Sequence, residues 1–207
     1  MARLNIHLAL DEQTVAFCRW VNANIRGIAK SAIVFSEKSP MIPHITLVMG
    51  DFVPSQNFEA LTRATEMLAQ KVRPLTLKLG QPYIDLLTGR FVLCDIEEHP
   101  ALTELRKMMR ETLLGKYLTT PYANPREPHI TLAHIYTCQE KVESYLQSIH
   151  ELPSVVCSEI EISHVGPRGA CVSRLFDLDL THQRERRVPV RRNQLSLGGV
   201  AYATLPQ

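Results

Sequence analysis

A five-residue sequence, Pro-His-Ile-Thr-Leu, occurs twice in the chain, at residues 43–47 and again at residues 128–132. In an extended strand successive side chains point to opposite faces, so the His and the Thr of each copy would share one face. The Ile and Leu between them favour strands, and a proline suits the first residue of a strand, where no ladder hydrogen bond is lost. Each copy is therefore predicted to be a strand with one polar and one apolar face.

The side chains on the two polar faces are His44, Thr46, His129 and Thr131. Imidazole has an unperturbed pKa of about 6.5, so one histidine can accept a proton near neutrality while the other donates one. Threonine hydroxyls can donate hydrogen bonds to the two anionic oxygens of a phosphodiester. In-line displacement at phosphorus uses all four groups, so the histidines are predicted to be catalytic and the threonines to bind phosphate. The near-symmetric motifs do not show which histidine is the base.

A metal site is the competing use of paired histidines. It is disfavoured because no Asp, Glu or Cys stands at ligand spacing beside either motif, and because His129 and His134 would point to opposite faces of one strand. We therefore predict that the protein uses neither a metal nor another cofactor.

The first motif is embedded in a series of predicted strands and helices. Alternating apolar residues predict a strand at residues 4–10. Asp11 is predicted to cap a helix that ends at Gly27, and Ser55 to cap a second helix after the motif. A short strand is predicted at residues 32–35.

The second motif is embedded in the same order of elements. A strand is predicted at residues 91–96, followed by a helix that ends at Gly115. Thr137 is predicted to cap the helix after the motif. Residues 159–165 and 171–180 are predicted to form a hairpin around a Gly-Pro-Arg-Gly turn.

Two copies of one supersecondary unit pack most economically about an approximate two-fold axis. The predicted fold class is therefore α+β and bilobal, with two pseudo-two-fold-related β-sheet lobes, flanking helices and a central cleft that places His44 opposite His129. One domain is expected at residues 1–180, with lobes at roughly 1–82 and 90–180 that are allowed to intertwine. Residues 181–207 carry five arginines against one glutamate and are predicted to be a basic C-terminal extension.

The composition is that of a globular protein with a full core, with 207 residues of which 45% are hydrophobic and 21% are charged. A net charge of +2 is not typical of a protein that coats nucleic acid generally. The N-terminus is predicted to be a strand entering a helix rather than a signal peptide, and no segment approaches the roughly 18 apolar residues of a membrane span. Five cysteines without C-x-x-C spacing favour a reducing cytoplasm. We expect a cytoplasmic monomer that does not associate with membranes.

The doubled motif resembles the H-x-T-x signature of the two-histidine (2H) phosphoesterase superfamily. The form Pro-His-Ile-Thr-Leu is similar to its bacterial 2′-5′ RNA ligase and RNA 2′,3′-cyclic phosphodiesterase branch, and the order of elements from residue 3 to about residue 180 fits the bilobal fold of that family. The resemblance implies that His44 and His129 are the catalytic pair and that Thr46 and Thr131 hold the phosphate. It also implies that no metal is needed and that the substrates contain a 2′,3′-cyclic or 2′-5′ phosphodiester.

Substrate-binding residues are not fixed by the motif. Tyr122, as a base-stacking residue, and Arg126, as a phosphate ligand, are candidates because they lie in the loop just before the second motif; the alternative is that both are ordinary loop residues. The chain departs from many members of this branch at His134, where those members carry an arginine.

Three further aromatic side chains are not expected to take part in the site. His7 lies on the polar face of the first predicted strand, from which it could approach the cleft, and it is expected to be structural or exposed. Trp20 and Tyr145 stand at helical spacing with apolar residues, so core packing is expected rather than a platform for a nucleobase.

The leading functional hypothesis is a metal-independent phosphodiesterase that opens 2′,3′-cyclic phosphate, or cleaves 2′-5′ phosphodiester, at RNA ends or in nucleotides. One histidine deprotonates water, the water attacks phosphorus, and the other histidine protonates the departing ribose oxygen. The reverse reaction would join RNA through a 2′-5′ linkage. The alternative is a non-catalytic protein that binds phosphorylated RNA ends in the same cleft; it is disfavoured because arginine or lysine would hold phosphate better than paired histidines.

Overall fold

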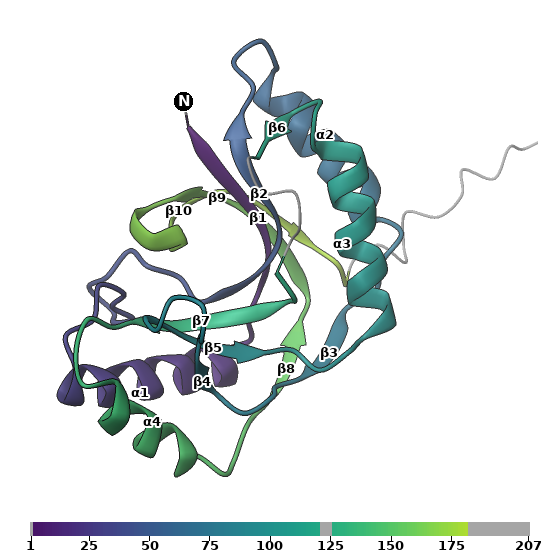
Figure 1. The fold of residues 1–207 in the computed structure, drawn as a ribbon. Coiled ribbons are helices and arrows are strands. Elements are labelled where there is room, and N and C mark those ends of the chain that lie inside the picture. Colours follow the sequence, from purple (N-terminus) through teal and green to yellow (C-terminus); the bar gives the residue numbers. More distant parts are fainter. Residues whose placement is uncertain (1, 121–125, 182–207) are drawn as a thin grey trace, which may run out of the picture.

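The computed structural model describes residues 2–120 and 126–181, and all structural statements concern these residues. The elements follow one another along the chain as strands interspersed with helices (Figure 1). They are β1 (Arg3–Ala9), α1 (Glu12–Ile28), β2 (His44–Phe52), α2 (Phe58–Ala69), β3 (Leu75–Lys78), β4 (Tyr83–Ile84), β5 (Phe91–Asp95), α3 (Pro100–Leu113), β6 (Leu118–Thr119), β7 (His129–His134), α4 (Gln139–Gln147), β8 (Ser154–Cys157), β9 (Glu159–Val165), the 3-10 turn η1 (Pro167–Gly169) and β10 (Cys171–Asp179).

The two motif strands are neighbours at the centre of one large antiparallel sheet. Its strand order is β10-β9-β1-β2-β7-β5-β4, with β6 pairing to the far end of β2, while β3 and β8 form a separate ribbon. Strands β2 and β7 meet through the pair Ile45 and Ile130, which are the same residue of the two motifs. The predicted α+β, bilobal fold is confirmed, with β10-β9-β1-β2 forming the sheet of one lobe and β7-β5-β4 that of the other.

Two of the helices, α1 and α3, pack against the lobe that does not contain the strand preceding them in the sequence. Helix α1 directly follows β1 but contacts β7 and α4, whereas α3 directly follows β5 but packs on β2 beside α2. Figure 1 shows α2 and α3 side by side along the outer end of β2, and α1 and α4 together near β7, β5 and β4. The lobes therefore exchange elements from the two halves of the chain.

The motif strands have the predicted polar and apolar faces. Ile45, Leu47, Ile130 and Leu132 are buried, whereas the histidine and threonine of each motif are partly exposed. A strand presents alternate side chains to opposite faces, so this burial fixes which face of the sheet carries the chemistry.

Asp11 caps α1 as predicted. One of its carboxylate oxygens accepts a hydrogen bond from the backbone N–H of Thr14 (2.9 Å), and the other accepts one from the backbone N–H of Val156 in β8 (2.6 Å). The helix continues through Gly27 to Ile28, so the predicted end at Gly27 is wrong by one residue. The cap residue Ala29 is extended and not left-handed, so no glycine is needed there.

The strand predicted at residues 32–35 is not formed, because a buried side chain takes the place of a neighbouring strand. Asn22 of α1 donates hydrogen bonds to the carbonyls of Ile33 (3.1 Å) and Leu132 (2.8 Å), and its Oδ1 accepts from the N–H of Phe35 (3.0 Å). These bonds satisfy the backbone of an irregular segment and join α1 to the second motif strand.

Two predicted helix caps are displaced. Helix α2 is capped by Asn57 instead of Ser55, through its side-chain oxygen and the N–H of Glu59 (2.9 Å). Helix α4 is preceded by Cys138 instead of Thr137; Cys138 is left-handed (φ 59°) and makes no side-chain cap. The last turn of α3 ends at Leu113 and leads to Gly115, whose φ of 79° suits the predicted glycine.

Trp20 is not a core residue as expected, since 53% of its surface is exposed. Its ring lies 6.2 Å from that of Tyr145 on α4 and 6.3 Å from that of Phe17, so the three rings pack at the edge of the α1–α4 contact. Within residues 2–120 and 126–181, no helix combines the length and hydrophobicity that a membrane span requires.

Candidate active site

A cavity of about 700 Å³ lies over the junction of β2 and β7. Its lining includes His44, Thr46, His129 and Thr131, so the structure brings together the four residues that the repeated motif singled out. They reach one cavity because Ile45 and Ile130 pair on the opposite, buried face of the sheet.

The register of this pair sets which groups are neighbours. In an antiparallel pair the residue after one partner lies opposite the residue before the other. Thr46 therefore lies across from His129, and His44 lies across from Thr131. Each imidazole has the hydroxyl of the other motif beside it, which is a suitable arrangement for holding one tetrahedral phosphate between two proton-transfer groups.

The two imidazole rings are oriented by equivalent hydrogen bonds to a backbone carbonyl. The Nδ1 atom of His44 lies 2.8 Å from the carbonyl oxygen of Ile42, and that of His129 lies 2.8 Å from the carbonyl oxygen of Glu127. In both motifs this carbonyl belongs to the residue before the proline. Because a carbonyl only accepts, Nδ1 carries the proton and Nε2 is the nitrogen that exchanges protons.

His44 has a buried amide beside its Nε2. The Nδ2 group of Asn5 on β1 lies 3.0 Å from Nε2 of His44 and 3.0 Å from Oγ1 of Thr46, and Asn5 is fully buried. The thiol of Cys171 lies 3.6 Å from the same nitrogen. Burial, and to a smaller extent the charge of His129, lowers the pKa of His44 to about 4, against the opposing effect of the Ile42 carbonyl.

His129 has a carboxylate as its flanking neighbour. Asp95 of β5 pairs in register with His129, and the hydroxyl of Tyr83 donates to Asp95 (3.0 Å). Burial lowers the pKa of His129, the Glu127 carbonyl and Asp95 raise it, and Arg126 and Arg106 lower it. The near-symmetric motifs thus have different electrostatic surroundings, with an amide beside one histidine and a carboxylate beside the other.

A buried polar cluster lies behind His44. The rings of His7 and His44 are 4.8 Å apart, and Nε2 of His7 lies 3.0 Å from Oγ of Ser163 and 3.8 Å from a carboxylate oxygen of Glu161. Arg174 pairs with the other oxygen of Glu161 at 2.5 Å. His7 is completely buried, so the expectation that it is structural or exposed holds only for a structural role. Burial holds the pKa of His7 well below its usual value and raises the pKa of Glu161.

The two predicted substrate-binding residues differ in what the structure shows. Arg126 lines the cavity, and its guanidinium is paired with Asp85 at 2.9 Å. Tyr122 lies outside the described residues. The prediction that His129 and His134 point to opposite faces of one strand is wrong, because a register shift in the pairing of β5 with β7 places His134 opposite Phe91, which lines the cavity. His134 is buried, with its ring in edge contact with those of Phe91 (4.6 Å) and Tyr136 (5.0 Å).

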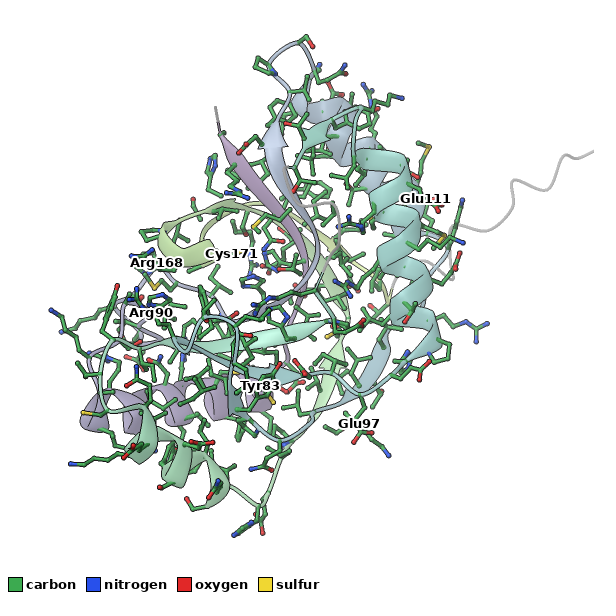
Figure 2. The ribbon with its side chains drawn as sticks, in the orientation of Figure 1. Tyr83, Arg90, Glu97, Glu111, Arg168 and Cys171 are labelled. Atoms are coloured by element: carbon green, nitrogen blue, oxygen red, sulfur yellow. The ribbon has the colours of Figure 1, made fainter. Side chains whose placement is uncertain are left out.

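Sequence reasoning did not find several charged residues of the cavity wall. These are Arg3, Arg106, Arg110 and Arg168. Arg168 lies on η1 with a left-handed backbone (φ 60°), and Figure 2 shows it near Cys171, the first residue of β10. The Gly-Pro-Arg-Gly sequence indicated the turn but not that the turn lies beside His44 and Thr131, with which Arg168 and Gly169 line a small adjoining cavity.

In the described part of the chain, no group of three or more His, Cys, Asp or Glu side chains is arranged to hold a metal ion. The chemical groups that converge on the cavity are imidazoles, hydroxyls and guanidinium groups. Imidazoles transfer protons, and hydroxyls and guanidinium groups hold anionic oxygens, so the site suits acid–base chemistry on a phosphate ester.

Comparisons with known proteins agree with the fold and the motif. The model of the 2′-5′ RNA ligase superfamily matches residues 34–163. The crystal structure of TT0787 of Thermus thermophilus is similar at 19% sequence identity and a TM-score of 0.61, over 86% of this chain and 97% of that chain. E. coli LigT in its apo form is similar at 19% identity and a TM-score of 0.57, over 87% of this chain and 98% of that chain, and a complex of LigT with 3′-AMP has a TM-score of 0.53 at 19% identity over the same shares. No curated protein has a significantly similar sequence.

Proposed function

Because the chain belongs to the 2′-5′ RNA ligase superfamily of two-histidine phosphoesterases, we propose that it hydrolyses 2′,3′-cyclic phosphate, or 2′-5′ phosphodiester, at RNA ends or in nucleotides. The proposed reaction uses no metal, and its reverse would form a 2′-5′ linkage. The family supports an enzyme of the phosphoesterase or ligase type; the cyclic phosphate substrate is the proposed refinement.

The observation that carries this proposal is the convergence of both motifs on one cavity. Two imidazoles have Nδ1 held by a carbonyl, which leaves Nε2 for proton transfer, and each has a threonine hydroxyl of the other motif across from it. A protein that only binds phosphate has no need for a second imidazole in the same register. The 3′-AMP named in the LigT complex is a nucleotide with a 3′-phosphate, which is similar in kind to a product of the proposed reaction.

In the proposed mechanism one histidine takes a proton from water, whose oxygen forms a bond to phosphorus on the side opposite the leaving oxygen. The bond from phosphorus to one ribose oxygen breaks, and the other histidine donates its proton to that oxygen. Thr46 and Thr131 donate hydrogen bonds to the two oxygens that do not react. A phosphomonoester and a free ribose hydroxyl result, and the two histidines have exchanged protonation states.

The surroundings of the histidines favour one direction of proton flow. A pKa of about 4 keeps His44 neutral near pH 7, which suits the group that accepts a proton from water. Burial also lowers the pKa of His129, but the carboxylate of Asp95 opposes this effect and favours the charged form, so His129 is the better suited of the two histidines to donate a proton. In hydrolysis we therefore place His44 as the base and His129 as the acid.

Incubation of the purified chain with a 2′,3′-cyclic nucleotide in the presence of EDTA tests the function. We expect hydrolysis that is unchanged by EDTA. His44→Ala and His129→Ala should each lower kcat by about 10²–10⁴-fold, and the double variant should lose far less than the product of the two because the residues act as a unit. His150→Ala, which changes an exposed histidine, is the matched control.

Tight binding of a phosphorylated RNA end without turnover would instead support the non-catalytic alternative. Activity that EDTA abolishes and added zinc or manganese restores would contradict the two-histidine mechanism.

A further inference from the structure

One row of side chains crosses the central sheet at right angles to its strands. Glu161 of β9 pairs in register with His7 of β1, and His7 pairs with Thr46 of β2. On the other side of Thr46 the row continues with His129 of β7, which pairs with Asp95 of β5. Paired residues of neighbouring strands point to the same face of a sheet, so this face carries a carboxylate on each side of the reacting groups. Asp95 lies beside His129, and Glu161 lies beyond His7.

The side chains behind His44 are closed off from solvent. His7, Glu161 and Ser163 each have 0% of their surface exposed. The ring of His7 lies 4.8 Å from that of His44. Its Nε2 atom lies 3.0 Å from Oγ of Ser163 and 3.8 Å from Oε2 of Glu161. This is not the arrangement of a Ser-His-acid hydrolase triad, in which the acid and the hydroxyl bond to opposite ring nitrogens. One imidazole ring therefore separates the Glu161 carboxylate from His44, in surroundings where charges are screened less than in water.

Stability alone does not explain a carboxylate in this position. Arg174 of β10 forms an ion pair with Oε1 of Glu161, but half of the arginine side chain is exposed, whereas the glutamate side chain is not exposed at all. Oε2 of Glu161 accepts no hydrogen bond from any described residue. Taking a carboxylate out of water is costly, and replacing a buried ion pair with apolar side chains is often neutral or stabilising. A buried charge of this kind is better explained by a group on which it acts.

His44 is a group that needs such a charge. Burial lowers its pKa to about 4, the carbonyl of Ile42 opposes that effect, and the charge of His129 lowers the pKa further. The neighbours of its Nε2 atom are the Asn5 amide at 3.0 Å and the Cys171 thiol at 3.6 Å, and both are neutral groups. When His44 takes a proton from water, the imidazolium therefore forms in a buried position beside neutral partners.

The charge of Glu161 reaches the surroundings of that nitrogen. Burial and, to a smaller extent, the charge of Glu161 raise the pKa of the Cys171 thiol to about 12, against the opposing effect of Asn5. The same thiol lies 3.6 Å from Nε2 of His44, so a negative charge that acts on the thiol also acts on the imidazole. A nearby negative charge favours the protonated form of an imidazole.

We propose that Glu161 is a positioning residue for the proposed reaction, and that its carboxylate stabilises the proton that Nε2 of His44 takes from water. This inference rests on the proposed function, and it gives the base a counterpart of Asp95, which acts on the acid. The proton leaves water as the oxygen of that water bonds to phosphorus, and Glu161 itself neither gives nor takes a proton.

Other charged groups face the same carboxylate. Arg174 and Asp177 face it from β10, Glu159 lies beside it on β9, and His7 faces it from β1. Burial raises the pKa of Glu161, Arg174 lowers it, and Glu159 and Asp177 raise it. Arg174 is thus the group that favours the charged form of Glu161, and its own positive charge opposes the effect of that carboxylate on the imidazoles.

Glu161→Gln, which replaces the carboxylate with an amide of the same shape, is the first test. The pKa of His44 is followed in the full chain by NMR titration of its isotope-labelled imidazole, a measurement that requires no turnover. We expect this pKa to fall by about 0.5–1 pH unit, the size expected of one charge beyond a neighbouring side chain. With a cyclic mononucleotide, kcat should fall by about two- to fivefold because the base is weaker, and KM should change little.

Arg174→Gln should act in the opposite direction. It removes the positive charge that opposes Glu161, so the pKa of His44 should rise, whereas Arg174→Lys keeps the charge and should leave the pKa unchanged. The double variant of Glu161→Gln and Arg174→Gln should lie between the two single variants. Glu59→Gln and Arg63→Gln change an exposed ion pair on α2 (3.2 Å) and are matched controls that should have no effect. Thermal melting of each variant establishes that it is folded.

An unchanged pKa of His44 in folded Glu161→Gln would overturn the inference. Movement in the same direction in Glu161→Gln and Arg174→Gln would show that the ion pair only holds β9 to β10, and would overturn it as well. If Glu161→Gln does not fold, the variants of Arg174 decide: a rise with glutamine but not with lysine supports the inference, and no rise overturns it.

The same measurements separate this inference from the proposed function. A pKa of His44 that moves as expected, in a protein that hydrolyses no cyclic nucleotide, would support the action of Glu161 on His44 and contradict the function. Hydrolysis with a pKa that no variant moves would support the function and overturn the role of Glu161.

Discussion

His44 and His129 occupy equivalent positions in the two motif strands, but the strands that flank them carry different groups. Asn5 on β1 places an amide at Nε2 of His44, and Asp95 on β5 places a carboxylate beside His129. An amide N–H favours the neutral imidazole, whereas a carboxylate favours the charged one. Two substitutions that exchange these chemical groups test the proposed roles separately.

Asn5→Asp replaces the amide with an isosteric carboxylate. An anion beside Nε2 favours imidazolium, so the pKa of His44 should rise. Since His44 must be neutral to accept a proton, the acidic limb of the kcat/KM profile should move to higher pH. Asn24→Asp, on α1 away from the cavity, is the control. An acidic limb that does not move would show either that His44 is not the base or that Asn5 does not contact His44.

Asp95→Asn removes the carboxylate beside His129. The pKa of His129 should fall, and because His129 must be protonated to act as the acid, the alkaline limb of kcat/KM should move to lower pH. The measurement is the same pH profile on a cyclic mononucleotide. Movement of the acidic limb instead would reverse the assignment and make His129 the base.

Thr46→Val and Thr131→Val delete a hydroxyl and keep a β-branched strand residue. A lost hydrogen bond to a charged group is worth about 1.5–3 kcal/mol, so kcat/KM should fall by about one to two decades for each while the melting temperature changes little. Thr76→Val, on an exposed position of β3, is the matched control. Full activity in both variants would show that the threonines only pack.

At the scale of elements, the short strand β6 is held against β2 by a close backbone approach. A Cβ added to Gly50 would lie 2.5 Å from the carbonyl oxygen of Thr119 and 3.2 Å from Cβ of Leu118. A glycine is required there because the nearest atom, the carbonyl oxygen of Thr119, belongs to the backbone and cannot move aside as the end of a side chain would. The pairing of β6 with β2 thus depends on one residue.

Gly50→Ala should therefore lower the free energy of unfolding by about 1–3 kcal/mol, the usual effect of overpacking. Gly27→Ala is the matched comparison, because a Cβ at Gly27 would meet nothing within 4 Å and the residue lies in α1. That substitution should stabilise the protein by about 0.4–1 kcal/mol. Equal effects of the two alanines in urea unfolding would contradict the close approach of β6.

At the scale of the whole molecule, several imidazoles lie within or beside the central sheet with a pKa below the unperturbed value of about 6.5. They are His7, His44, His129 and His134, and burial is the main cause for each. Below pH 6.5 the unfolded chain binds protons that the folded chain does not, so stability is lost as the pH falls from 6.5 toward 4. The raised pKa of buried Glu161 acts in the opposite sense, because its folded form retains a proton that the unfolded form releases.

The four histidines with a lowered pKa should outweigh the one glutamate with a raised pKa. The melting temperature should therefore fall by about 5 °C or more between pH 7.5 and pH 5. His7→Gln removes one of the buried imidazoles and should reduce this pH dependence. His150→Ala, at an exposed position, should leave it unchanged. A melting temperature that is constant across this range would show that the imidazoles are not held neutral by burial.

The sequence by itself determined the polar and apolar faces of the two motif strands, the cap at Asp11, the hairpin of β9 and β10 and the α+β class. Each of these depends on the period of side chains along one segment or on a bond between residues close in sequence, as between Asp11 and Thr14. The doubled His-x-Thr motif likewise identified four candidate residues that share the cavity. This was possible because each copy of the motif can be recognised from a few consecutive residues.

Only the tertiary structure decided which residues surround those four. Asn5 contacts His44 across 39 residues, Asp95 reaches His129 through strand pairing, and Arg106 reaches Arg126 from a helix of the other lobe. The failure of the strand at residues 32–35 has the same origin, since Asn22 bonds to it from α1. Such neighbours are brought together when segments distant in the sequence pack against each other. The free energy of that packing depends on the whole core, so no repeating pattern along the chain predicts which residues will meet.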